Sequence, residues 1–104
     1  MKVWIGPAGN CIGAKEKGTE GSLKYLKEIG LNAQEIEFVR SIYLSNQKAE
    51  EIGERAAKLG IKLSVHAPYY INLNSEKKKV VEKSKFFILA SLERANYMKA
   101  ECVV

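Results

Sequence analysis

Residues 56–65, AAKLGIKLSV, join the end of a predicted helix to the start of a predicted strand through one glycine, Gly60. Similar junctions recur at residues 27–38, KEIGLNAQEIEF, and at residues 96–104, NYMKAECVV, although the last one lacks a glycine. A glycine at a helix end adopts positive φ at little cost, and a short helix-to-strand connection is typical of parallel βα repeats. The three junctions therefore predict alternating helices and parallel strands, with the helices packed on the outer face of the sheet.

Hydrophobic periodicity extends this interpretation outward to four strands and three helices. The strands are expected at residues 3–5, 33–39, 61–65 and 101–104. Thr19 or Ser22 is expected to cap the first helix, Ser45 the second and Ser75 the third. This order fits either a small open α/β sheet or the first half of a (β/α)₈ barrel. Since the last strand has no helix after it, the half-barrel is favoured.

The composition is typical of a soluble globular protein, because 46% of the 104 residues are hydrophobic and 28% are charged. No apolar run approaches the roughly 20 residues that cross a bilayer, and the first residues do not resemble a secretory signal. The two cysteines, Cys11 and Cys102, are far apart and match no metal or redox motif, which favours reduced thiols. We therefore expect one cytoplasmic domain without a membrane partner.

The charge is uneven along the chain. Lys and Arg exceed the acidic residues by 17 to 12, and every acidic residue is Glu, so a usual partner of catalytic histidines, Asp, is missing. Residues 1–52 carry seven basic and seven acidic groups, whereas residues 53–104 carry ten and five. This basic bias is compatible with a phosphate-bearing partner, although a solvated, lysine-rich helix face is the simpler explanation.

His66, the only histidine, directly follows the predicted third strand in the segment SVHAPYYINLNS, residues 64–75. In parallel α/β proteins ligands bind at the carboxyl ends of the strands. Pro68 leads the chain out of the strand, and the adjacent Tyr69 and Tyr70 give the loop an aromatic character that suits contact with a ligand. Each residue alone also has a structural explanation: a hydrogen-bonded histidine, and two tyrosines that cover the core.

Residues 65–74, VHAPYYINLN, followed by a helix rich in Glu and Lys, resemble endonuclease IV, the TIM-barrel abasic-site endonucleases of AP endonuclease family 2. The pattern HxxYxINL stands after the predicted third strand, as in that family, and the opening MKVWIGPAG agrees with it. The resemblance implies a partial TIM barrel in which residues 1–104 form one N-terminal half-barrel.

The resemblance also implies a chemistry. Endonuclease IV enzymes bind a cluster of divalent metals, usually zinc, that activates water and neutralises phosphate, so that DNA is cut 5′ to a missing base. His66 would then be a metal ligand through a neutral imidazole nitrogen. Tyr69 and Tyr70 would lie in a loop that wedges against DNA with an abasic site, and Arg40 would be the basic probe of the preceding loop.

The chain departs from the family in two loops, which leaves a second interpretation open. The loop after the first predicted strand reads IGPAGN, residues 5–10, where a histidine is common, and residues 38–46, FVRSIYLSN, do not align cleanly. A metal-dependent sugar isomerase or epimerase of the same superfamily is the alternative. Glu37, at the end of the second predicted strand, would then matter as much as His66, unless it is simply a solvated carboxylate.

The 104 residues alone contain one clear metal ligand, whereas a zinc site takes about four donors. We therefore expect no fully coordinated zinc, no catalytic residue of its own and no appreciable DNA cleavage by this chain in isolation. It is expected to be a truncated product or an excised fragment of a larger zinc-dependent hydrolase. A non-catalytic half-barrel that self-associates through its exposed strand edges is the other expectation.

Overall fold

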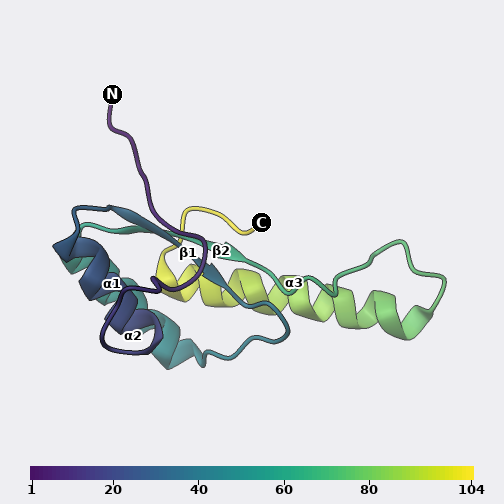
Figure 1. The fold of residues 1–104 in the computed structure, drawn as a ribbon. Coiled ribbons are helices and arrows are strands. Elements are labelled where there is room, and N and C mark those ends of the chain that lie inside the picture. Colours follow the sequence, from purple (N-terminus) through teal and green to yellow (C-terminus); the bar gives the residue numbers. More distant parts are fainter.

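The computed structural model describes residues 1–104 and contains three helices and a two-stranded parallel sheet (Figure 1). Its elements, in chain order, are α1 (Gly18–Glu28), β1 (Ala33–Glu37), α2 (Asn46–Leu59), β2 (Lys62–His66) and α3 (Lys78–Met98). The strands pair in register from Ala33 opposite Lys62 to Glu37 opposite His66. None of the three helices combines the length and the hydropathy that crossing a bilayer requires.

Two further segments extend the sheet without forming regular strands. Near the amino terminus, Ala8 forms one parallel bridge with Glu35 of β1. At the carboxyl terminus, Val103 forms one parallel bridge with Val65 of β2. Four chain segments therefore run parallel, in the spatial order that the βα repeats of the sequence predict.

The strand predicted at residues 3–5 is wrong, because the side chain of Asn32 replaces a regular backbone ladder there. The amide N–H of Ile5 donates to Asn32 Oδ1 over 2.7 Å, and Asn32 Nδ2 donates to the carbonyl of Val3 over 2.9 Å. Val3 and Ile5 are both 59% exposed. Backbone bonds hold this segment as well, because the N–H of Asn32 donates to the carbonyl of Ile5 over 3.1 Å and the N–H of Glu35 donates to that of Pro7 over 3.0 Å.

The helix ends confirm one predicted cap and correct the others. Ser45 caps α2 by accepting a hydrogen bond from the backbone N–H of Lys48 over 3.1 Å. Neither Thr19 nor Ser22 caps α1, because both lie inside that helix and are buried. Ser75 does not cap α3, which begins three residues later; its hydroxyl accepts from the N–H of Lys77 in a local turn.

The core lies between one face of the sheet and the helices, which Figure 1 shows on a single side of the strands. Along β1 and β2, buried residues that face the helices alternate with half-buried ones on the other face. The buried residues from the strands and helices that form the centre of the core are Ile36, Leu63, Val65, Leu23, Leu26, Ile52 and Met98. The opposite face of the sheet remains polar and free of helices.

Both strand boundaries differ slightly from the predicted ranges of 33–39 and 61–65. β1 ends at Glu37, and Val39 adopts a φ of 52°, a left-handed conformation that does not continue a strand. β2 begins one residue later than predicted and includes His66. The backbone of Val39 therefore turns the chain sharply just where the loop towards α2 begins.

Candidate functional site

The loops that follow β1 and β2 lie side by side at the carboxyl ends of the two strands. The backbone N–H of Phe38 donates to the carbonyl of His66 over 3.0 Å, and the N–H of Tyr69 donates to the carbonyl of Val39 over 3.1 Å. Because these bonds join residues about 30 positions apart, they fix the two loops relative to each other. The candidate site is built on this pair of loops.

Glu37 and His66 end their strands directly opposite each other in the parallel register. Both side chains are half-buried and belong to the helix-free face of the sheet. Gly9 leaves room for the carboxylate, because a Cβ at this glycine would lie 3.2 Å from Glu37 Oε2. Next along the same face, Ser64 Oγ donates to Glu35 Oε2 over 3.2 Å. A short row of polar groups thus follows this face towards the strand ends.

The imidazole of His66 has one nitrogen engaged and one free. Its Nδ1 lies 2.8 Å from the carbonyl oxygen of Ala67. Since a carbonyl only accepts, Nδ1 carries the hydrogen in this bond, and the neutral ring keeps a lone pair on Nε2. This is the tautomer in which a histidine binds a metal through Nε2, with its other nitrogen held by an acceptor.

The donors on this chain fit one side of a metal site and do not complete one. Glu37 and His66 offer an oxygen and a nitrogen, a pair that suits zinc. However, no group of three or more His, Cys, Asp or Glu side chains gathers anywhere in the structure in a way that could hold an ion. Cys11 and Cys102 are free thiols. The chemistry of the two donors is therefore suitable, but their number is not.

The structure brings Arg40, Tyr69 and Tyr70 together at the strand ends, although Arg40 belongs to a different loop. The tyrosine rings lie 4.5 Å apart at their centroids with an interplanar angle of 42°, and their hydroxyl oxygens are 3.4 Å apart. The two side chains are 55% and 54% exposed. The contact with the Tyr70 hydroxyl, and then the Arg40 guanidinium, lower the pKa of Tyr69, whereas the same contact raises the pKa of Tyr70.

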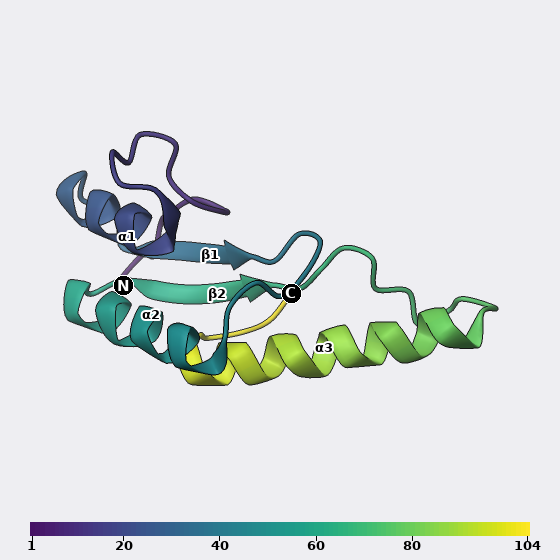
Figure 2. The ribbon, with the colours of Figure 1, turned by 90° about the horizontal axis from the view of Figure 1, so that it is seen from below.

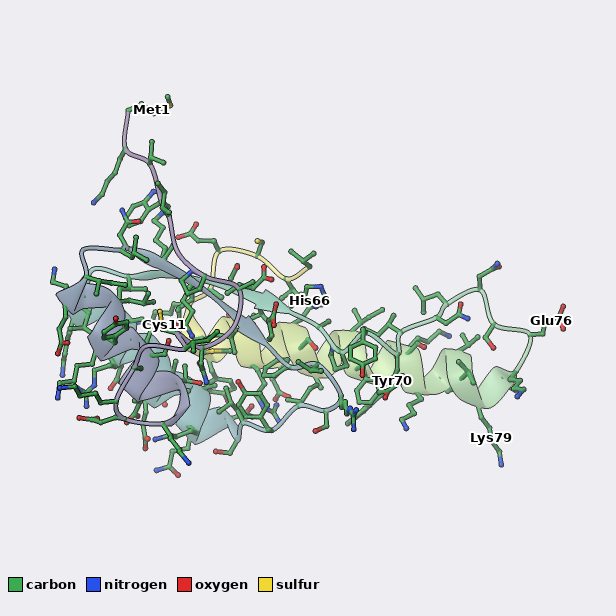
Figure 3. All side chains as sticks on the ribbon, in the orientation of Figure 1. Met1, Cys11, His66, Tyr70, Glu76 and Lys79 are labelled. Atoms are coloured by element: carbon green, nitrogen blue, oxygen red, sulfur yellow. The ribbon has the colours of Figure 1, made fainter.

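The loop that carries the tyrosines is anchored on α3 by a buried hydroxyl. Ser84 Oγ accepts from the backbone N–H of Asn72 over 2.8 Å and donates to the carbonyl of Val80 over 2.7 Å. A groove of about 360 Å³ lies beside this anchor and is lined by Tyr70, Val80, Lys83 and Ser84. Figure 3 shows Tyr70 beyond His66 along the chain, over α3. The position of the pair is thus set by α3 as well as by the sheet.

Sequence reasoning did not identify Gly9 or Ser84 as part of the site. Gly9 belongs to the loop of residues 5–10, and its φ of 82° is typical of a turn. Its closeness to Glu37 depends on chain segments that are distant in sequence. Ser84 lies on the buried face of α3 and is 1% exposed. A serine among the apolar residues of this face is the sequence signal for such a contact, and Ser91 gives the same signal without making one.

Comparison with known proteins identifies the family. Residues 23–104 match the xylose isomerase-like TIM barrel family, which covers most of the chain. The chain belongs to the xylose isomerase-like TIM barrel family. An uncharacterised protein of Methanocaldococcus jannaschii is 35% identical over 80 residues, which are 77% of this chain and 28% of that protein.

Solved structures of this TIM-barrel type share the fold. D-psicose 3-epimerase from Clostridium cellulolyticum H10, solved with D-tagatose, superposes with a TM-score of 0.72 at 20% identity and covers 85% of this chain. SacUVDE superposes with a TM-score of 0.60 at 17% identity and covers 82% of this chain. This chain spans 31% and 34% of those two proteins. The predicted fold class, a partial TIM barrel with parallel strands and outer helices, is confirmed.

Proposed function

We propose that residues 1–104 form the N-terminal half-barrel of an endonuclease IV-like enzyme that cuts DNA at abasic sites in the cytoplasm. The observation that supports this proposal is the half-exposed tyrosine pair with Arg40, in the loop that follows His66 at the ends of parallel strands. Side chains that stack on bases and a guanidinium that binds phosphate are the two kinds of group that hold a distorted nucleic acid. The motif around His66 in the sequence supports the same conclusion.

The proposal gives each residue a role that its geometry supports. When bound, a divalent metal such as zinc would supply an activated water and neutralise the scissile phosphate. His66 would hold it through the free Nε2, while Ala67 fixes the ring through Nδ1. Tyr69 and Tyr70 stack against bases next to the missing one, and Arg40 binds a backbone phosphate beside them. The remaining ligands would have to come from outside these residues.

The first test measures how the isolated chain binds DNA. We expect it to prefer a duplex with a tetrahydrofuran abasic analogue over the same intact duplex, as measured by fluorescence anisotropy. Tyr69→Ala and Tyr70→Ala are each expected to reduce this preference about fivefold or more, because stacking on a base contributes about 1–3 kcal/mol. Tyr97→Ala is the control, because Tyr97 is 39% exposed at the far end of α3. Equal binding of both duplexes would overturn the proposal.

The second test measures cleavage. With zinc present, the 104-residue chain is expected not to nick the abasic duplex, because it supplies only two donors of a metal site. In a longer protein that contains these residues and completes the barrel, nicking is expected. There, His66→Ala should remove nicking and lower the zinc content of the purified protein. Unchanged nicking and zinc content in this variant would remove the ligand role from His66.

A sugar isomerase or epimerase is the second candidate, and the register of the sheet favours it. Glu37 lies opposite His66 on the helix-free face, with room for its carboxylate beside Gly9. An acid and a histidine at adjacent strand ends also suit proton transfer at a sugar carbon. For this candidate, a completed barrel should convert a ketose such as D-tagatose, and Glu37→Gln should abolish conversion. The tyrosine variants would then leave DNA binding unchanged, which separates the two functions.

A further inference from the structure

The amino half of α3 is the most basic part of the molecule. Residues 76–85, EKKKVVEKSK, contain five lysines and two glutamates, so they hold a net charge of +3 out of +5 for the chain. Figure 2 shows that this half of α3 extends beyond the sheet at the end where the loop after β2 emerges. In Figure 3, Lys79 projects from this protruding end. The excess positive charge is therefore concentrated on the side of the tyrosine pair.

Four of these lysines are available to a partner. Lys85 pairs with Glu82 at 3.3 Å. The other four make no ion pair within the chain, and we call them the α3 basic strip: Lys77, Lys78, Lys79 and Lys83. All four are exposed. Elsewhere, Lys48 of α2 bonds to both Glu20 and Glu51. Other basic side chains, Lys27 and Lys58 among them, are also unpaired, but no other segment of seven residues holds four such lysines.

This arrangement does not stabilise the helix. The first turn of α3 contains no acidic residue, and lysines there face the positive end of the helix dipole. Each such charge destabilises the helix at low salt, and the like-charged pair Lys79 and Lys83, one turn apart, adds repulsion. An anion bound alongside would offset both costs. The charge pattern therefore fits a polyanionic partner better than a helix optimised for stability.

The strip is continuous with the proposed DNA site. Lys83 lines the groove that also contains Tyr70, and its Nζ lies 5.5 Å from the ring of Phe87. From Lys83 to Lys77 the helix rises about 9 Å, since each residue adds 1.5 Å. Successive base pairs of DNA rise about 3.4 Å, so this length matches two or three phosphates of one strand.

We propose that the α3 basic strip binds backbone phosphates of the DNA on one side of the abasic nucleotide. The inference rests on the proposed function, because the tyrosine pair defines where the abasic nucleotide lies. Tyrosines can stack on bases, and lysines without an ion-pair partner can bind phosphates. The two together suit a DNA strand whose bases and phosphates are both accessible. The strip supplies affinity that does not depend on base sequence, whereas the tyrosines distinguish the abasic site.

The test is the salt dependence of DNA binding by the 104-residue chain, measured by anisotropy over a series of KCl concentrations. For Lys79→Gln/Lys83→Gln, the slope of log affinity against log salt should fall by about 0.9 for each phosphate that is no longer neutralised, hence by roughly 2. Affinity should fall equally for the abasic and the intact duplex. Lys27→Gln/Lys58→Gln is the matched control, since it removes the same charge from the last turns of α1 and α2. The control should keep the wild-type slope.

The outcomes separate this inference from the proposed function. If the strip variant and the control have equal slopes, the strip does not bind DNA. If the slope falls but the wild type does not prefer the abasic duplex, the strip still binds phosphate and the abasic-site function fails. The strip variant should melt at the same temperature as the wild type or higher, because it relieves repulsion in α3. Weaker binding therefore cannot be attributed to unfolding. Two further duplexes are each shortened on one side of the abasic site. The strip variant and the wild type should bind equally to the duplex that lacks the side contacted by the strip, and should still differ on the other.

Discussion

Two serines on one helix show how much the surroundings of a buried hydroxyl matter. Ser84 and Ser91 are 1% and 0% exposed on α3. The hydroxyl of Ser84 bonds to the backbone of Asn72 and Val80, whereas the hydroxyl of Ser91 has no hydrogen-bond partner. A buried hydroxyl without a partner destabilises a protein, and one with two partners stabilises it. The same substitution is therefore expected to have opposite effects at the two positions.

We expect Ser91→Ala to raise the free energy of unfolding by about 1 kcal/mol, because it removes an unpaired buried polar group. Ser84→Ala should lower it by about 1 kcal/mol, because the N–H of Asn72 is left without its acceptor. Urea denaturation followed by circular dichroism measures both values, and each variant serves as the control for the other. Amide exchange at Asn72 should also become faster in Ser84→Ala only. Destabilisation of equal size at both positions would contradict this account.

The tyrosine pair gives a second prediction at the residue scale. Because the Tyr70 hydroxyl, followed by Arg40, lowers the pKa of Tyr69, Tyr70→Phe should raise that pKa towards its ordinary value. Arg40→Gln should raise it by less. NMR of tyrosines labelled at Cζ measures the change residue by residue. A Tyr69 pKa that does not rise in Tyr70→Phe would show that the two hydroxyls do not interact.

The sign of this shift also predicts how DNA binding depends on pH. Tyr69 is neutral below its pKa and negatively charged above it. Because its pKa is lowered, Tyr69 ionises at a less alkaline pH than an ordinary tyrosine. A tyrosinate repels phosphate, and DNA affinity should therefore decrease on the alkaline side. Tyr69→Phe cannot ionise at this position and should keep more of its affinity there. The comparison uses the two proteins at the same salt concentration.

At the scale of elements, the contact between α2 and α3 depends on Gly53. A Cβ at this position would lie 2.5 Å from the carbonyl oxygen of Met98 and 2.8 Å from its Cα. Figure 2 shows the carboxyl end of α3 against α2, where these residues meet. Because the obstructing atoms belong to the backbone, the helices would have to move apart to admit even a methyl group.

Gly53→Ala is therefore expected to destabilise the protein by up to about 2 kcal/mol. Alanine favours a helix by roughly 1 kcal/mol over glycine, but overpacking costs about 1–3 kcal/mol and outweighs it. For a domain of this size, 1 kcal/mol lowers the melting temperature by about 4–8 °C. The neighbouring exposed position, Glu54→Ala, is the control and should change the melting temperature little. A higher melting temperature for Gly53→Ala would show that the two helices can separate at low cost.

The elements show what local sequence patterns predict well. Gly60 at φ 70° and the cap at Ser45 follow from rules that involve a few consecutive residues, and both were predicted. The predicted helix cap at Ser22 is wrong, because the Ser22 hydroxyl donates to Gln34 of β1 over 2.6 Å instead of capping α1. Likewise, a contact between Arg40 and Tyr69 depends on two loops meeting in space. Periodicity indicates which elements exist, whereas these polar contacts depend on how the elements pack.

For the candidate site, too, local sequence predicts some features and not others. The position of His66 at a strand end could be predicted, because a strand followed by a proline-containing loop is a local pattern. The register that places Glu37 opposite His66 could not be predicted, since it depends on the pairing of two strands. The tautomer of His66 depends on a single bond to Ala67. Sequence therefore indicated the residue types of the site, and the structure supplied their mutual arrangement.

At the scale of the whole molecule, the chain is more open than a compact domain of its length. Its radius of gyration is 14.5 Å, against about 13 Å expected for 100 residues. Only 23 of its 104 residues are buried, so much apolar surface remains exposed. The exposed apolar side chains at the first edge of the sheet and along α3 are Val3, Ile5, Phe86, Leu89 and Leu92. Both edges and the outer side of α3 are therefore available for contact with other protein surfaces.

We propose that isolated chains associate through the two open edges of the sheet. Ala8 and Val103 make no backbone hydrogen bond within the chain, although their neighbours bond to β1 and β2. Their N–H and C=O groups therefore point outward, and such edges pair readily with another strand. Ile5 lies beside the first edge and adds exposed apolar surface.

Light scattering over a range of protein concentrations should show this association, and Ile5→Lys should weaken it at least several-fold because a charge at a strand edge opposes pairing. Ile12→Lys is the matched control. Ile12 is fully exposed and belongs to the loop before α1, outside the segments that bridge to the sheet, so this variant should associate like the wild type. If both lysine variants associate equally, the contact does not use the sheet edge, and the apolar side of α3 becomes the surface to substitute next. A wild type that remains monomeric at every concentration would contradict association through the edges of the sheet.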